Sequence, residues 1–200
     1  MNRVIVDTDF LNHILQASSG EEILKKIIDF FDFQFLIHPW TYDREIKNIS
    51  TATQKFVEQY ATILDYNDFI TNEGEEKMYD FHFHSLFNEM NFKQLSLGKQ
   101  TFRTYNKSGE NLGEIHSVLL SLFLNIPVLL SDDYNAREIA AKRINMQGYC
   151  LNVKTSFDIM CEMIKTDKKI LSIEEAVSVI RNYNQKRQKD NIKTIKGLYK

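Results

Sequence analysis

Carboxylate side chains recur where apolar segments of this sequence end. Asp7 and Asp9 follow the apolar run Val4–Val6, and the pair Asp132–Asp133 follows Val128–Leu130. Short apolar runs of this kind are typical of strands that are buried on both faces of a parallel sheet. Because parallel strands end at the same edge of a sheet, we expect these acids to lie close together, in the crevice where such sheets bind ligands.

Two further acids are expected at the same edge. Glu45 lies near the start of a helix predicted after the strand Phe33–Ile37, and Glu114 opens an apolar helix that ends at the turn Asn125–Pro127. Crowded carboxylates repel one another, and some would bind protons unless a cation compensated them. A hard divalent ion such as Mg²⁺ or Mn²⁺ prefers such oxygen ligands and supports phosphoester chemistry. The expected site comprises Asp7, Glu45, Glu114 and either Asp132 or Asp133.

Each acid also has a purely structural interpretation when it is taken alone. Glu114 in the first turn of a helix could complement the helix dipole. Asp132 and Asp133 precede a helix and could cap it, and Asp7 or Asp9 could cap a helix that begins at Phe10. The metal-site hypothesis is favoured because the structural interpretation needs several separate coincidences of position.

The rest of the sequence alternates predicted strands with predicted helices. This order predicts a three-layer α/β/α sandwich around a mainly parallel sheet. Capping boxes at Ser19–Glu22 and Ser172–Glu175 mark the starts of two helices. The predicted strands are Val4–Val6, Phe33–Ile37, Val128–Leu130 and Tyr149–Val153. The predicted helices include Phe10–Gln16, Ile23–Phe31, Trp40–Ser50, Met78–Met90, Phe157–Ile164 and Ile173–Tyr183.

Residues 51–110 differ from the flanking parts of the chain and are predicted to form a helical insertion closed by polar loops. Within them, His82 and His84 are two positions apart, which would place both on one face of a strand. The surrounding apolar residues have helical spacing, so we interpret these histidines as surface residues and not as metal ligands.

Bulk composition indicates one soluble domain. The chain has 200 residues, of which 43% are hydrophobic and 26% charged. Cys150 and Cys161 stand apart, which indicates neither a disulfide framework nor a zinc site. The N-terminus lacks the pattern of a signal peptide, and no apolar run is long enough to span a membrane. These features predict a cytoplasmic protein with no membrane partner.

The net charge of -2 gives no general argument for nucleic-acid binding, so any such argument must be local. Residues 181–200 are the exception, because they are strongly basic. Lys186, Arg187 and Lys189 in this segment are candidates for contact with an RNA backbone. The alternative is a solvated and partly disordered C-terminal helix.

Three segments of the chain together resemble PIN-domain proteins, a ribonuclease family that includes many bacterial toxin nucleases. They are VIVDTDFL, FLIHPWTYDREI and GEIHSVLLSLFLNIPVLLSDDYNAREIA. The resemblance is most specific in the last segment and hardly covers residues 51–110. It implies a PIN-like fold and divalent-metal-dependent cleavage of RNA, and in toxin-type members a small antitoxin protein as partner. The oligomeric state stays open, with a homodimer as one candidate.

The resemblance also implies roles for the acids, position by position. Asp7 would be the first metal-binding acid, Glu45 the second and Glu114 the third. Asp132 is the preferred fourth because it follows the strand directly, with Asp133 as helper or substitute. The chain is longer than a minimal PIN domain, and Asp9 is an acid where the family often has a small polar residue.

Two other functions compete with the nuclease. One is a phosphatase that resembles the haloacid-dehalogenase family, with Asp7 as nucleophile and Asp9 as general acid passing through an aspartyl-phosphate. That family's signature is incomplete here, because Leu11 and Ser131 occupy positions where other residues are expected. The other is a PIN-like module that binds RNA or protein without catalysis.

Overall fold

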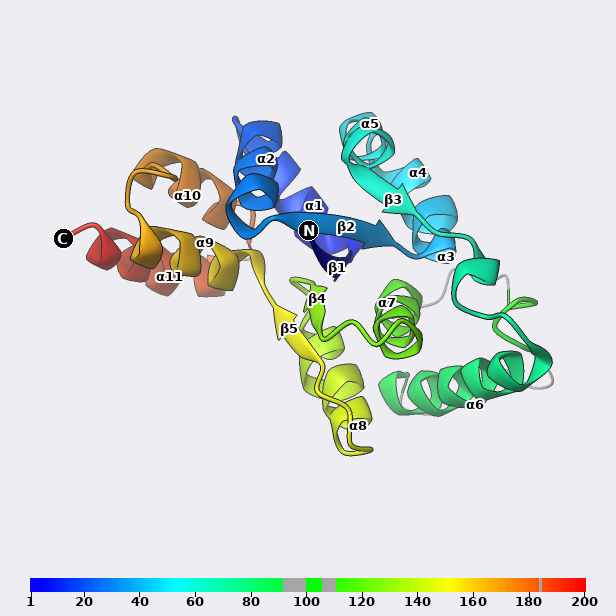
Figure 1. Cartoon of the computed structure of the whole chain (residues 1–200). Helices are drawn as coiled ribbons and strands as arrows, with labels where there is room; N and C mark the ends of the chain where they lie inside the picture. The colour runs from blue at the N-terminus through cyan, green and yellow to red at the C-terminus, as the bar shows by residue number, and fades with distance from the viewer. Residues whose placement is uncertain (92–99, 106–110, 184) are drawn as a thin grey trace.

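Five parallel strands form one central sheet, in the order β3-β2-β1-β4-β5 (Figure 1). The computed structural model describes residues 1–91, 100–105, 111–183 and 185–200, apart from the side chains of residues 185–187. The strands are β1 (Asn2–Val6), β2 (Phe33–Ile37), β3 (Ala61–Ile63), β4 (Val128–Leu130) and β5 (Asn152–Lys154). The parallel pairing confirms the predicted α/β class.

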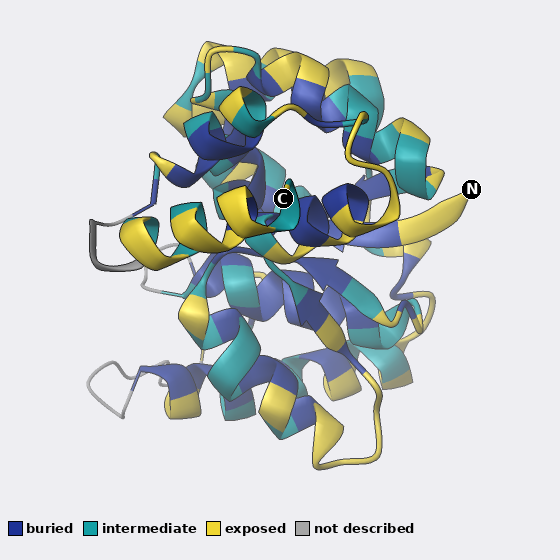
Figure 2. Cartoon of the chain, turned by 90° about the vertical axis from the view of Figure 1, so that its left-hand side faces the viewer, coloured by how far each residue is buried: buried dark blue, intermediate teal, exposed yellow. Residues whose placement is uncertain are grey.

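Both faces of the sheet are buried, because apolar side chains alternate along the strands. Val4 and Val6 pack into the core on one face, whereas Ile5 packs into a second core on the other face. The first core involves α1 (Thr8–Leu15), α2 (Gly20–Phe31), α5 (Thr51–Tyr60), α9 (Ser156–Thr166), α10 (Ile173–Ile180) and α11 (Gln185–Leu198). The second involves α6 (Glu73–Met90), α7 (Leu112–Phe123), the π-helix η3 (Ala136–Ala141) and α8 (Lys142–Asn145). Figure 2 shows the resulting contrast between a buried interior and exposed outer helix faces.

The strand order reverses between β1 and β4. The chain adds β2 and β3 on one side of β1 and then places β4 and β5 on its other side. The backbone N–H of Asp7 donates to the carbonyl of Leu130 at 2.9 Å, so the carboxyl ends of β1 and β4 lie side by side. Such a reversal point is where open parallel sheets form their ligand-binding crevice.

The structure corrects the bounds of the predicted insertion. Ala61–Ile63 is strand β3, which pairs in parallel with β2, so residues 51–63 belong to the regular α/β unit. Helical spacing of the apolar residues hid this three-residue strand, since so short a run cannot show a two-residue period. The last strand is also displaced, from the predicted Tyr149–Val153 to Asn152–Lys154.

The helix predicted at Trp40–Ser50 contains a π-helical turn. It consists of α3 (Pro39–Thr41), η1 (Tyr42–Ile46) and α4 (Lys47–Ile49). Single π-turns inside α-helices occur often at functional sites. His82 and His84 lie in helix α6, as their helical surroundings predicted. A short 3-10 helix, η2 (Tyr66–Asp68), follows β3, and among the described helices none has the length and apolar character to cross a membrane.

Candidate metal centre

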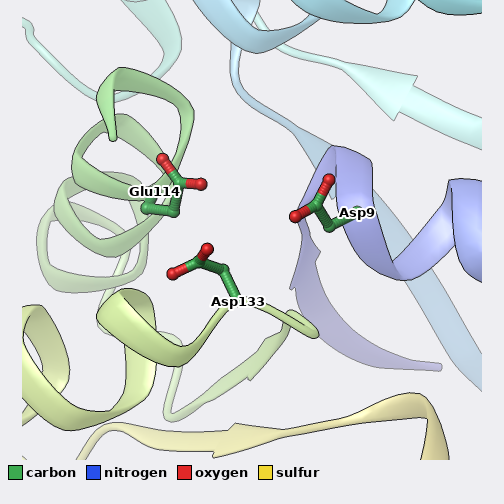
Figure 3. A group of neighbouring side chains, drawn as sticks. All are labelled: Asp9, Glu114 and Asp133. Carbon is green, nitrogen blue, oxygen red and sulfur yellow. The ribbon is translucent and has the colours of Figure 1, made fainter. Parts of the chain in front are cut away.

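Three carboxylates converge at the reversal point of the sheet. Asp9 comes from the first turn of α1, Glu114 from the first turn of α7, and Asp133 from the loop after β4 (Figure 3). One oxygen of each lies within 4.8 Å of the others. All three side chains are partly exposed to solvent. An acidic cluster that could bind a metal ion is therefore present, formed by segments that are far apart in the sequence.

Asp7 lies beside this cluster but is held as part of the protein interior. It is the N-cap of α1, and its carboxylate accepts hydrogen bonds from Thr8 N at 2.9 Å and Ser131 Oγ at 3.0 Å. Only 2% of Asp7 is exposed. Asp7 therefore caps α1, as the structural interpretation predicted, and it is not one of the three residues of the acidic cluster. Its role as a metal ligand stays a prediction.

Glu45 reaches the same place from the π-helical turn η1. Its carboxylate accepts the Thr8 hydroxyl at 2.6 Å and a hydrogen bond from the backbone N–H of Gly113. Gly113 leaves the space for this approach, since a Cβ at that position would lie 2.5 Å from Glu45 Oε1. The extra residue of the π-turn and a glycine on α7 together set the position of Glu45.

The acids around the cluster favour their protonated forms in the absence of a cation. Burial is the largest cause of the raised pKa of Glu114, and the charges of the neighbouring acids bring that pKa to about 8. The pKa of Asp7 is raised well above its usual range, first by burial and then by the charges of Glu114 and Glu45. Burial likewise raises the pKa of Asp9 and Glu45. A bound divalent cation would offset both the burial of these charges and their repulsion, so the cluster is a candidate cation site.

The adjacent acids Asp132 and Asp133 have different surroundings. The side chain of Asp132 has an exposed fraction of 0% and accepts hydrogen bonds from Ser156 N and Oγ at 2.8 Å each and from Tyr183 Oη at 2.7 Å. His13 Nδ1 lies 2.9 Å from its other side. Of the two, Asp133 joins the acidic cluster, whereas Asp132 connects α1 with α9 and the end of α10. Asp132 as the metal ligand stays a prediction, and this arrangement favours Asp133.

Asp133 serves two purposes at once. Its Oδ1 accepts the backbone N–H of Asn135 and of Ala136, which caps the helix that continues as η3. The capping interpretation made from the sequence is thus true of Asp133 without excluding a role in binding. Asp9 is the residue that the sequence analysis missed, because no hypothesis placed it in the metal site. Its position two residues after Asp7, in the first turn of a helix, was the available signal.

A hollow of about 240 Å³ opens beside the acids. It admits a small ligand group and is lined by four acids and one basic residue. Arg44, in the π-turn next to Glu45, supplies a positive charge to its wall. The lining comprises Asp7, Thr8, Asp9, Arg44, Glu45, Asn48, Ile49 and Glu114.

Gly113→Ala is expected to weaken the metal site without unfolding the protein. The new methyl group would displace the Glu45 carboxylate, while alanine is favoured over glycine inside a helix by about 1 kcal/mol. We expect Mn²⁺ affinity, measured by titration calorimetry, to fall about tenfold. Gly197→Ala in α11 is the matched control, since a Cβ there meets no atom within 4 Å. Equal Mn²⁺ affinity in the two variants would remove Glu45 from the site.

The stability of the metal-free protein should fall as pH rises through the titration of Glu114. A pKa raised from 4.5 in the unfolded chain to about 8 in the fold stabilises the fold fully below pH 4.5, and this contribution is lost toward pH 8. A bound cation needs the deprotonated acids, so Mn²⁺ should raise the melting temperature more at pH 8 than at pH 5.5. A shift that is independent of pH would contradict this linkage.

The basic C-terminal segment forms helix α11, which packs with α9 and α10 at the left of Figure 1. Lys189 is exposed on it, whereas the side chains of Lys186 and Arg187 lie outside the described residues. Contact of these three residues with RNA stays a prediction.

Comparison with known proteins adds no family to these observations. No protein-family model matches the chain, and searches of the curated proteins and of the solved structures find no match. Membership of the PIN-domain family therefore stays a prediction that depends on the motifs quoted from the sequence.

Proposed function

We propose that this protein is a divalent-metal-dependent ribonuclease that hydrolyses phosphodiester bonds of RNA. The observation that supports it is the convergence of Asp9, Glu114 and Asp133, with oxygens within 4.8 Å of one another, at the reversal point of a parallel sheet. The cluster offers only oxygen ligands, which suits Mg²⁺ or Mn²⁺. The choice of RNA as substrate comes from the resemblance to PIN-domain proteins.

The residues of the chain would divide the work between holding the ion and placing the substrate. Asp9, Glu114 and Asp133 would hold the ion, with Asp7 and Glu45 beside them, and a bound cation would favour the ionised forms of these acids. Arg44 lines the hollow where a phosphate would enter and would offset its charge. When bound, a divalent ion polarises a phosphate oxygen and lowers the pKa of a coordinated water.

The phosphatase alternative fits the observed geometry less well. A carboxylate that attacks phosphorus must be ionised and open to the substrate. Asp7 is buried, accepts hydrogen bonds on both oxygens and has a pKa raised mainly by burial. The residue that would act as nucleophile is therefore enclosed inside the protein, and its raised pKa opposes the ionised form that attack on phosphorus requires.

Cleavage of labelled single-stranded RNA tests the proposal. We expect fragments in Mn²⁺ or Mg²⁺ and none in EDTA, and the fragments should end in a free 3′-hydroxyl or a simple phosphate. A 2′,3′-cyclic phosphate would instead indicate attack by the RNA itself, as in a metal-independent ribonuclease. Turnover of p-nitrophenyl phosphate with no RNA cleavage would favour the phosphatase instead. Metal binding with neither reaction would favour a non-catalytic module.

A further inference from the structure

A second hollow adjoins the acidic one and differs from it in chemistry. It measures about 250 Å³ and is bordered mainly by aromatic and basic side chains. Arg44 lines both hollows, so the two are neighbours on the surface. Its lining comprises Trp40, Arg44, Tyr66 and Arg103, the buried Phe102 and Tyr105, and also Pro39 and Asp43, and we call this set the aromatic groove.

The planar guanidinium of Arg103 is held in this groove by ring contacts and an ion pair. Its guanidinium lies 4.8 Å from the ring centroid of Tyr66 and 5.0 Å from that of Phe102. An ion pair between Arg103 Nε and Glu76, at 2.5 Å, fixes the guanidinium from α6. The exposed fraction of the Arg103 side chain is still 40%. A guanidinium that is held in place by stacking loses little further freedom when it binds a ligand.

Trp40 is also held by a ring contact, and this contact is with the helix that carries Glu114. Its ring stacks on His116 at 5.1 Å between centroids, and His116 lies two residues after Glu114 on α7. His116 is itself held by the Tyr79 hydroxyl, 2.8 Å from Nδ1. Trp40 is half-buried and keeps part of its surface exposed.

Aromatic rings beside arginines match the chemistry of an unpaired nucleotide. Single-stranded nucleic acids bind where bases stack on aromatic or guanidinium planes and where cations meet the phosphates. Bases in a duplex are stacked on one another and cannot use such a groove. The groove differs from a docking site for an apolar peptide because arginines form part of its wall and because it continues into the acidic hollow.

We infer that the aromatic groove binds the base of an unpaired nucleotide that adjoins the phosphate placed at Asp9, Glu114 and Asp133. This inference rests on the proposed ribonuclease function and specifies its substrate as single-stranded. It also gives a role to part of the segment between β3 and α7, which the sequence left unassigned. Base stacking of this kind is sequence-tolerant, so weak preference among bases is expected.

The only tryptophan of the chain lies in the groove, and its fluorescence therefore reports on binding directly. In EDTA, which prevents cleavage, a single-stranded 2′-O-methyl oligoribonucleotide should quench Trp40 in a saturable way. The same sequence as a duplex, and a polyphosphate chain without bases, should not. Arg103→Ala should weaken binding about tenfold, because a stacked contact is lost. The matched control is Arg3→Ala, because Arg3 is exposed and lies near the amino end of β1, whereas the acids follow its carboxyl end.

Tyr66→Phe and Tyr66→Leu separate stacking from folding. The first keeps the aromatic ring and should bind as the unchanged protein does, whereas the second should bind several-fold more weakly at a temperature where both variants are folded. Absence of quenching, or equal quenching by polyphosphate, overturns the groove as a base site. Quenching without RNA cleavage in Mn²⁺ leaves the groove standing and removes the ribonuclease. RNA cleavage at an unchanged rate in Arg103→Ala would support the ribonuclease and remove the groove as a base site.

Discussion

Glu114→Gln is expected to reduce Mn²⁺-dependent RNA cleavage by about a hundredfold or more, with the fold preserved. Changes in residues that merely support a metal ligand cost about 10- to 100-fold, so loss of a charged ligand should cost at least as much. The substitution keeps the shape of the side chain and removes one of three oxygens that lie within 4.8 Å of one another. It also removes a charge whose burial, and then repulsion by neighbouring acids, raise the pKa of Glu114, so the metal-free variant should melt at a higher temperature at pH 8.

The measurement pairs cleavage rates with calorimetric titration of Mn²⁺. Asp133→Asn and Asp9→Asn should behave like Glu114→Gln, because all three residues share the cluster. Asp132→Asn, measured at a temperature where it remains folded, should still bind Mn²⁺. Full activity and full Mn²⁺ affinity in Glu114→Gln would exclude the cluster as the catalytic metal site. Loss of Mn²⁺ affinity in Asp132→Asn, at equal folding, would return Asp132 to the ligand set.

Two adjacent aspartates are expected to have opposite effects on stability. Asp132→Asn should lower the free energy of unfolding by about 3 kcal/mol, because a buried acceptor of several hydrogen bonds is replaced by a group that donates on one side. Ser156 and Tyr183 would then face an amide N–H₂ or lose a partner. Asp133→Asn keeps a good helix cap and removes one of the repelling charges, so the metal-free protein should be at least as stable as before.

Urea denaturation of both variants in EDTA measures this contrast. An equal loss of stability at the two positions would contradict the assignment of Asp132 to the interior. The pH dependence gives a second check. Burial lowers the pKa of His13, but the hydrogen bond and charge of Asp132 raise it by more. A histidine whose pKa is raised in the fold contributes its full stabilisation below about pH 6.5, and this contribution is lost as the pH rises through the folded pKa. The stability deficit of Asp132→Asn should therefore shrink in alkaline solution.

The sequence was informative about elements and about the edge of the sheet where acids gather. Apolar runs predicted β2 and β4 with their observed bounds, since strands buried on both faces need continuous apolar residues. It could not predict β3, where Ala61–Ile63 is too short to show a period and becomes a strand only by pairing with β2. The π-turn that places Glu45 is likewise invisible to a 3.6-residue pattern.

The aromatic groove had no signal in the sequence at all. Trp40, Tyr66 and Arg103 are spread over more than sixty positions and belong to no motif. They meet because η2 and the segment around Arg103 fold back over α3, with Glu76 of α6 holding the guanidinium in place. Contacts of this kind depend on tertiary packing, which neither spacing nor composition encodes in a readable way.

The sequence by itself determined that carboxylates follow β1 and β4 and that a parallel sheet would bring them to one edge. Only the tertiary structure decided which of them share a site. After a strand, neighbouring residues leave the backbone in different directions, so Asp132 turns toward His13 and Tyr183 while Asp133 turns toward Glu114. Asp9 enters the cluster because α1 begins at Thr8 and carries the carboxylate around its first turn. Direction of a side chain is set by its packed surroundings, and residue type alone does not specify it.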